Sequence, residues 1–263
     1  MARAMGSPVH PVAPATQTTV MGLPSLGRRV GERCTPSATS RQRVRWPCAD
    51  TVGVVMADHW WWRPGWAPGR RYVTWHLTLG DLPAARAVAE RYRSAVASFP
   101  GLDVVPDPWL HLTMQGVGFV DELEADAASR IAQSASERLA AVDPVEAWLA
   151  PAQVGTEGIY LPVDPFDGLQ RVRLLVRAAT VDVLGSASGD ADTFWPHVSV
   201  AYSNQVGPSQ DIEDAVAQVD FLGAAVTVAH VDLICLGRDS HLYEWETIAR
   251  VPLGQVGGRR PRS

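Results

Sequence analysis

The sequence predicts an α+β protein built as two lobes, and three observations support this. The chain has 263 residues, 46% of them hydrophobic, which at roughly 100–200 residues per domain allows one large domain or two modest lobes. From residue 72 onward, segments with strand alternation and segments with helical periodicity follow one another. Their spacing lacks the regular strand–helix–strand repeat of a doubly wound parallel sheet, which favours two α+β lobes.

The first half of this region contains two predicted strands and two predicted helices. Apolar residues alternate over residues 72–79 and again over 109–115, as in half-buried strands. A helical stripe of apolar residues runs through 82–99. A second helix is expected to begin at Asp121, whose carboxylate suits an N-terminal cap, and to end near Val142.

The second half uses the same kinds of element in a different order. The alternation and periodicity predict, in chain order, a hairpin of 145–153 with 158–163, a helix over 166–184, a strand over 195–202, a short helix over 209–219 and a closing hairpin of 224–236 with 242–251. Three arginines fall close together on the long helix, where they are predicted to form a solvated face: Arg171, Arg173 and Arg177.

Charge and composition divide the chain into four predicted parts. The first fifty residues contain seven arginines against two acidic residues and are rich in Pro, Thr and Ser, so residues 1–55 are predicted to be a disordered basic tail. Translation beginning at Met56 explains this tail better than an organelle transit peptide, although the composition is compatible with either. Residues 56–71 form a Trp/Arg-rich strap, residues 72–253 the two-lobed domain, and residues 254–263 a flexible C-terminal tail.

Composition also excludes several classes of protein. No apolar run approaches the roughly 18–20 residues that cross a bilayer, so no membrane span is predicted and a cytoplasmic location is expected. The cysteines Cys34, Cys48 and Cys235 cannot form a disulfide framework, and their spacing matches no zinc site. Beyond the tail, 16 arginines face 26 acidic residues, which argues against binding along duplex nucleic acid but permits a small anion or an RNA end.

The strap has two possible roles. Residues 58–66 combine tryptophans with arginine, a mixture that can stack bases and hold phosphates. The same mixture can pack over one lobe, with arginines stacked on the rings, and form part of a cleft rim. Packing is the favoured role. Glu157 and Tyr160, at the predicted hairpin, are candidates for the cleft wall, whereas His230 and His241 are expected to be structural.

Three of the seven histidines share one short pattern, in which His is followed by an apolar residue, then Thr or Ser, then another apolar residue. Composition alone predicts about 0.2 such matches, so three are an excess. Each lies on a predicted strand, where alternate side chains share a face, so the imidazole and the hydroxyl project together about 6.5–7 Å apart. The matches are His76-Leu77-Thr78-Leu79, His111-Leu112-Thr113-Met114 and His197-Val198-Ser199-Val200.

Two such units facing each other across a cleft suit phosphodiester chemistry. One neutral imidazole can take a proton from an attacking water while the other, as imidazolium, gives a proton to the leaving oxygen. The hydroxyls can donate hydrogen bonds to the nonbridging oxygens as charge develops there. A metal site built from the three histidines is not expected, because no acidic or Cys ligand lies at metal-binding spacing.

The second and third motifs resemble those of the 2H phosphoesterases, in particular the bacterial 2′-5′ RNA ligase or RNA 2′,3′-cyclic phosphodiesterase group. The 86-residue separation of the two histidines and the Phe-x-Pro before the second are also similar to that family. The resemblance covers roughly residues 70–252 and rests on Trp109-Leu110-His111-Leu112-Thr113-Met114 and Phe194-Trp195-Pro196-His197-Val198-Ser199-Val200.

The resemblance implies a bilobal fold in which two pseudosymmetric antiparallel sheets, with outer helices, enclose a central cleft. It implies metal-independent opening of a 2′,3′-cyclic phosphate at an RNA 3′ end or on a small nucleotide, and in some members 2′-5′ ligation of RNA, without a cofactor. By this analogy His197 is the general base and His111 the general acid, in roles that exchange with reaction direction. Thr113 and Ser199 would hold the phosphate, in a protein expected to be a monomer.

The sequence departs from the family pattern in two places. Many members have an arginine shortly after the motif that corresponds to His197–Val200, where this chain has Tyr202; this ring either stacks on a base or is an ordinary strand aromatic. The first strand of the family does not normally supply a catalytic histidine, so His76 and Thr78 either line the cleft or match the motif by chance. A noncatalytic module that binds nucleotides or RNA ends with the same cleft is the alternative function.

Overall fold

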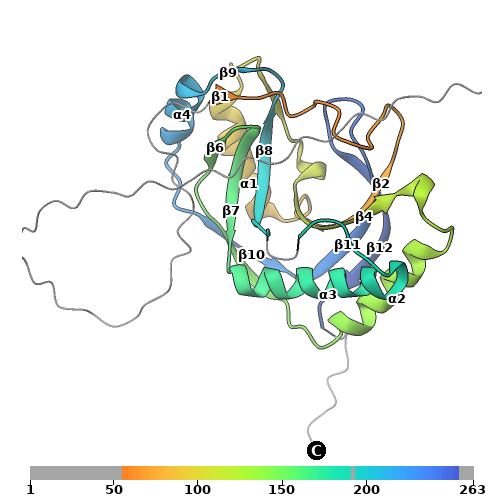
Figure 1. The fold of residues 1–263 in the computed structure, drawn as a ribbon. Coiled ribbons are helices and arrows are strands. Elements are labelled where there is room, and N and C mark those ends of the chain that lie inside the picture. Colours follow the sequence, from red (N-terminus) through yellow and green to blue (C-terminus); the bar gives the residue numbers. More distant parts are fainter. Residues whose placement is uncertain (1–54, 191–192, 255–263) are drawn as a thin grey trace, which may run out of the picture. The chain divides into compact units, whose positions relative to one another are not determined.

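A computed structural model describes residues 55–190 and 193–254 of the chain. The tails predicted over residues 1–55 and 254–263 lie, apart from Val55 and Gly254, outside the described residues. Within the described part, the chain forms an α+β structure with antiparallel sheets, as the sequence predicts (Figure 1).

The larger sheet has six strands, all paired antiparallel. Its backbone order is β10 (Ala224–Val228), β5 (Val145–Leu149), β7 (Gly158–Asp164), β8 (His197–Ser203) and β3 (Leu102–Val104), with β6 (Gln153–Gly155) pairing to β7. The β6–β7 hairpin is the turn predicted from the sequence. This sheet carries the motif that begins at His197.

The smaller sheet has four strands and carries the other two motifs. Its order is β12 (Glu244–Pro252), β11 (His230–Gly237), β2 (Tyr72–Thr78) and β4 (His111–Phe119). The two sheets approach each other where β4 meets β8, so the motifs at His111 and His197 lie on neighbouring strands of different sheets. A short pair, β1 (Val55–Met56) with β9 (Gly207–Pro208), anchors the start of the strap.

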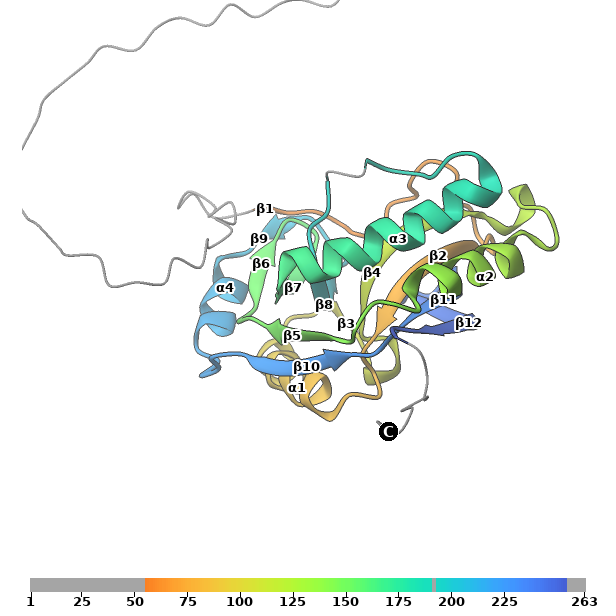
Figure 2. The same ribbon diagram turned by 90° about the horizontal axis from the view of Figure 1, so that it is seen from below.

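Four helices pack on these sheets in the described part of the chain. Helix α1 (Pro83–Val96) contacts α4 (Gln210–Ala217) as well as β10 and β8, whereas α2 (Ala127–Leu139) contacts β12. Helix α3 (Phe166–Leu184) lies alongside α2 and contacts β4 (Figure 2). The buried face of α1 is the predicted apolar stripe: Ala85, Val88, Ala89, Tyr92 and Val96.

Three element predictions are wrong. The strand predicted over 145–153 is interrupted, because β5 ends at Leu149 and β6 begins only at Gln153. The second helix begins at Ala127 rather than Asp121, because the Asp121 carboxylate accepts hydrogen bonds from Arg70 Nε at 3.0 and 3.1 Å and caps nothing. The strand predicted over 224–236 is two strands, β10 and β11, which belong to different sheets and are separated by Ala229 alone. Both halves alternate in the same way, so the alternation gives no sign of the change of sheet.

The predicted solvated face of α3 is also wrong for two of its arginines. Arg177 is half-buried and donates to Ser188 O at 2.8 Å. Arg171 is exposed, but Arg173 is buried, and its guanidinium donates to Met114 O at 3.0 Å and to Asp190 O at 2.7 Å. The same guanidinium lies over the Phe194 ring, 5.1 Å from its centre. Arg173 therefore joins α3 to the strand of one motif and to the segment that leads into the other.

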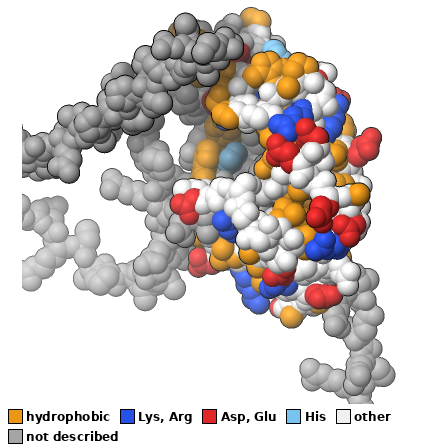
Figure 3. Space-filling view, turned by 45° about the vertical axis from the view of Figure 1, so that its right-hand side comes forward, with side chains coloured by type: hydrophobic (Ala, Val, Ile, Leu, Met, Phe, Trp, Pro, Cys, Tyr) orange, Lys and Arg blue, Asp and Glu red, His pale blue; other side chains and the backbone are white. Residues whose placement is uncertain are grey.

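The surface of the described part carries mixed charges. On the face shown in Figure 3, acidic and basic side chains are interspersed with hydrophobic ones rather than gathered into areas of one sign. Arg138, for example, pairs with Asp182 at 2.5 Å. Among the described helices, none combines the length and the apolar character needed to cross a membrane.

Candidate active site

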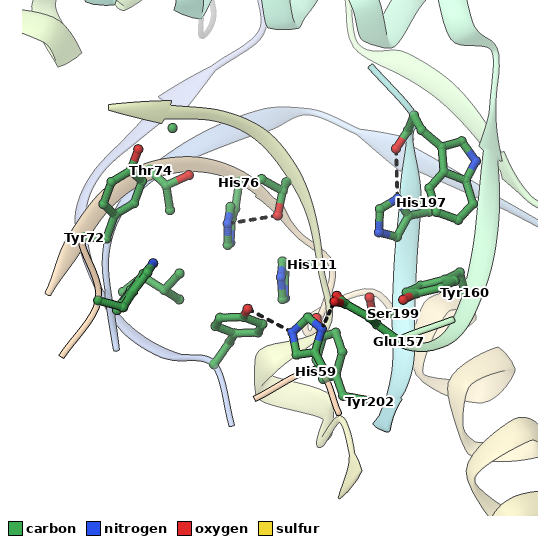
Figure 4. Close-up of a pocket in the computed structure, with 16 residues that line it drawn as sticks. His59, Tyr72, Thr74, His76, His111, Glu157, Tyr160, His197, Ser199 and Tyr202 are labelled. Atoms are coloured by element: carbon green, nitrogen blue, oxygen red, sulfur yellow. Dashed lines mark hydrogen bonds and ion pairs between the residues drawn. The ribbon is translucent and has the colours of Figure 1, made fainter. Parts of the chain in front are cut away.

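A cavity of about 500 Å³ lies between the two sheets and contains both halves of the predicted site. Strands β2, β4 and β11 line it from one sheet and β7 and β8 from the other, while the strap adds residues at one side (Figure 4). The lining residues are His59, Trp66, Tyr72, Thr74, His76, His111, Thr113, Gly116, Glu157, Tyr160, Trp195, His197, Ser199, Tyr202, Leu236 and Tyr243.

His111 and His197 are held in the same way. The Nδ1 of His111 lies 2.7 Å from Trp109 O, and the Nδ1 of His197 lies 2.8 Å from Trp195 O. A carbonyl oxygen can only accept, so each Nδ1 carries the proton and donates it to the carbonyl two residues earlier. In the neutral form, each Nε2 therefore keeps a lone pair. Two equivalent imidazoles are thus available to one cavity.

Both histidines are neutral at pH 7. Burial lowers the pKa of His111 from 6.5 to about 4, against the opposing effect of its bond to Trp109 O. Burial also lowers the pKa of His197, and its bond to Trp195 O again opposes the shift. A bound anion would raise both pKa values, because an opposite charge favours the protonated form.

Thr113 and Ser199 line the cavity two residues after the histidines, as strand alternation predicts. The Thr113 side chain is exposed to the cavity, whereas Ser199 is buried. A bulge in the β2–β4 pairing places Thr113 directly opposite His76, and residues directly opposite in an antiparallel pair share a face. His76 therefore also lines the cavity.

Thr78, in contrast, does not line this cavity. Its Oγ1 donates to Asp232 Oδ2 at 2.6 Å. Asp232 is fully buried on β11 and also accepts from Arg250 at 2.9 and 3.0 Å. A buried carboxylate requires such donors, and Thr78 supplies one of them. The first motif, His76 with Thr78, thus contributes its histidine to the cavity but not its hydroxyl.

Tyr202 lines the cavity but is not an open platform for a base. Its ring is 4% exposed and stacks on His59 at 4.2 Å, with 18° between the ring planes. One face is therefore already covered by a protein ring. This geometry fits Tyr202 as a packed strand aromatic rather than as a ring that stacks on a base.

His59 is one of the site residues that no sequence motif singles out, as are Thr74 and Tyr243. Its Nδ1 lies 3.1 Å from Glu157 Oε2 and its Nε2 lies 2.9 Å from Tyr243 Oη, while Arg63 pairs with Glu157 at 2.5 Å. His59 lacks the His-x-Thr pattern, and Glu157 is 98 residues away along the chain. The only indication in the sequence is the concentration of aromatic residues around it.

The strap packs against the domain and also forms part of the cavity wall. Trp60 is 7% exposed, and its Nε1 donates to Asp103 Oδ2 at 2.9 Å. Trp61 and Trp62 are each 48% exposed. Of these three strap tryptophans, one is thus buried in the core, and two are exposed at the surface. Glu157 and Tyr160 line the cavity, in the place expected for cleft-wall residues.

Because His111 is buried and neutral, stability is expected to fall in acid. With the pKa of His111 lowered from 6.5 to about 4, the unfolded chain takes up this proton at a higher pH than the folded protein does. The contribution of neutral His111 to the free energy of unfolding is complete above about pH 6.5. It decreases as the pH falls toward 4, by up to about 1.4 kcal/mol per pH unit. Urea denaturation between about pH 7.5 and pH 5 measures the slope. His111→Gln should flatten it, and an identical slope in that variant contradicts the prediction.

Comparison with known proteins identifies a matching family and similar folds. The family model of the 2′-5′ RNA ligase superfamily matches residues 80–240. The structure is similar to TT0787 of Thermus thermophilus, with 18% identity and a TM-score of 0.55 over 70% of this chain and 100% of that one. It is also similar to E. coli LigT complexed with 3′-AMP, with 16% identity and a TM-score of 0.51 over 71% and 99% of the two chains.

The search of curated proteins finds no match. The two structural similarities lie below 25% identity and establish the fold. The family match covers more than half of the sequence and includes both strands that carry His111 and His197. The chain therefore belongs to the 2′-5′ RNA ligase superfamily of 2H phosphoesterases.

Proposed function

We propose that the protein opens 2′,3′-cyclic phosphates, at RNA 3′ ends or on small nucleotides, to 2′-phosphomonoesters without a metal ion. One observation carries the proposal. Two imidazoles, each with its Nδ1 bound to the carbonyl two residues earlier, enter one cavity from neighbouring strands. Each is followed by a hydroxyl residue on the same strand face. This set provides an acid, a base and two donors for a phosphate.

In the proposed reaction, His197 Nε2 accepts a proton from water as the water oxygen bonds to phosphorus. The bond between phosphorus and ribose O3′ breaks, and His111 Nε2–H donates its proton to O3′. The two electrons of the broken bond leave with O3′. Thr113 and Ser199 donate hydrogen bonds to the nonbridging oxygens, whose charge increases in the transition state. His111 gains its proton when the anionic substrate binds and raises its pKa.

The site is suited to a small ligand or a chain end. A volume of about 500 Å³ is in the usual range for small-molecule sites, about 300–1,000 Å³. The LigT structure with 3′-AMP supports a nucleotide as the bound part. If the 5′-hydroxyl of a second RNA end takes the place of water, the same two imidazoles in the same roles would join the ends through a 2′-5′ bond, as His197 accepts the 5′-hydroxyl proton and His111 protonates the departing O3′.

The test is hydrolysis of nucleoside 2′,3′-cyclic phosphates by the full chain in excess EDTA. We expect turnover with the 2′-phosphomonoester as product, identified by phosphorus NMR. An RNA oligonucleotide with a 2′,3′-cyclic end, assayed in parallel, distinguishes an RNA-end substrate from a mononucleotide. Binding without turnover contradicts the enzyme and favours a noncatalytic binding module. Activity that EDTA abolishes contradicts the metal-independent mechanism.

A further inference from the structure

His76 is a third imidazole in the cavity, and the reaction above does not use it. It is 1% exposed and lies parallel to His111, with 4.3 Å between ring centres and 5° between ring planes. Its Nε2 is 3.3 Å from Thr113 Oγ1. His76 therefore contacts both the imidazole of His111 and the hydroxyl of Thr113.

The other nitrogen of His76 limits its tautomer. Nδ1 is buried and has no hydrogen-bond partner among the described residues. If Nδ1 carried the proton, the protein would bury an N–H without an acceptor, which is rarer in proteins than an unpaired acceptor. The favoured tautomer has a bare Nδ1 and a protonated Nε2, opposite to that of His111 and His197.

This tautomer determines the direction of the Thr113 hydroxyl. With a protonated Nε2, His76 donates to Thr113 Oγ1, and the threonine has no need to donate its own proton to His76. That proton is then free for a ligand oxygen in the cavity. With the opposite tautomer, Thr113 would donate to His76 and would offer the phosphate only lone pairs.

We propose that His76 is a positioning residue, which donates from Nε2–H to Thr113 and so leaves the threonine hydroxyl as a donor to the substrate phosphate. The proposal rests on the proposed phosphodiesterase function. On this proposal, the motif of His76 and Thr78 contributes only its histidine to the site.

Packing around His76 suits the same role. Its ring is in edge contact with Trp245 at 5.6 Å, and His111 contacts that tryptophan at 5.3 Å. The two imidazoles are thus fixed against one indole. Burial, and then the neighbouring His111, lower the pKa of His76 well below its usual value. His76 stays neutral, so it presents an uncharged ring face to His111 when that residue is protonated.

Nitrogen NMR of the wild-type protein tests the tautomer without any assay. In two-bond nitrogen–proton correlation spectra, a bare ring nitrogen is distinguished from a protonated one. We expect a bare Nδ1 in His76 and a bare Nε2 in both His111 and His197. A protonated Nδ1 in His76 overturns the proposal, whatever the protein's activity.

A double-mutant cycle then tests the link between His76 and Thr113. His76→Phe keeps a stacked ring but removes the donor, and Thr113→Val removes the hydroxyl. We expect His76→Phe to lower kcat/KM about 3- to 10-fold, the scale of one hydrogen bond. Adding it to Thr113→Val should cost little more, because the second change removes the group through which the first acts. His76→Gln, which restores a donor, should recover part of the loss.

Additive losses in the cycle would mean that His76 has only a packing role and would overturn the proposal. His230→Phe is the matched control, because His230 is half-buried on β11 and does not line the cavity. Inorganic phosphate affinity of the same variants is measured without turnover. If wild-type protein binds phosphate but opens no cyclic phosphate, the proposed function fails while the tautomer and the coupling remain testable.

Discussion

Replacing His111 with alanine is expected to lower kcat for opening a cyclic phosphate by at least about 100-fold, the usual scale of general acid–base catalysis. His197→Ala should have a loss of the same order, because the structure holds the two imidazoles equivalently. KM should change less than kcat in both variants, since Thr113 and Ser199 still offer donors to the phosphate. Steady-state kinetics with a nucleoside 2′,3′-cyclic phosphate provide both constants.

The double variant separates a shared role from two independent ones. Residues that act as one unit give losses that do not add, so His111→Ala with His197→Ala should be only slightly slower than the slower single variant. His230→Ala, outside the cavity, controls for the loss of a histidine as such. Near-normal activity in either single variant would rule out the assigned acid–base pair.

Replacing Arg173 with methionine is expected to lower the free energy of unfolding by about 2–4 kcal/mol. The change removes charged hydrogen bonds to Met114 O and Asp190 O, and hydrogen bonds to charged groups are worth about 1.5–3 kcal/mol each. At this chain length 1 kcal/mol shifts Tm by about 2–4 °C, so a loss of roughly 5–15 °C should follow. Differential scanning calorimetry measures it.

Arg171→Met is the matched control, because it removes the same charge two residues earlier on the same helix. Arg171 is exposed, and surface substitutions of this kind usually change stability by less than about 0.5 kcal/mol. Equal Tm values for the two variants would show that the bonds of Arg173 contribute no net stability.

The sequence predicts best the elements whose ends it marks locally. Helix α3 has the predicted bounds because Pro165 precedes it and Gly185 ends it in a left-handed conformation, at φ 75°. Asp121 looks like such a mark, but Arg70, distant in sequence, engages its carboxylate. The change of sheet at Ala229 has no local mark at all. Boundaries set by long-range partners are therefore the ones missed.

The same distinction applies to the site. The positions of His111, Thr113, His197 and Ser199 follow from strand alternation, so a pattern of four residues is enough to find them. His59 enters through contacts made across the fold, which no local pattern records. The burial of Arg173 did have a signal, because it lies four residues after buried Leu169 and three before buried Val176.

The single residue between β10 and β11 has a consequence for how a ligand is received. Because one continuous segment belongs to both sheets, β10 and β11 can move apart at this junction only by a change in the backbone at Ala229. This junction therefore limits how far the two sheets can separate. To that extent, conformational freedom between the two walls is lost on folding rather than on ligand binding.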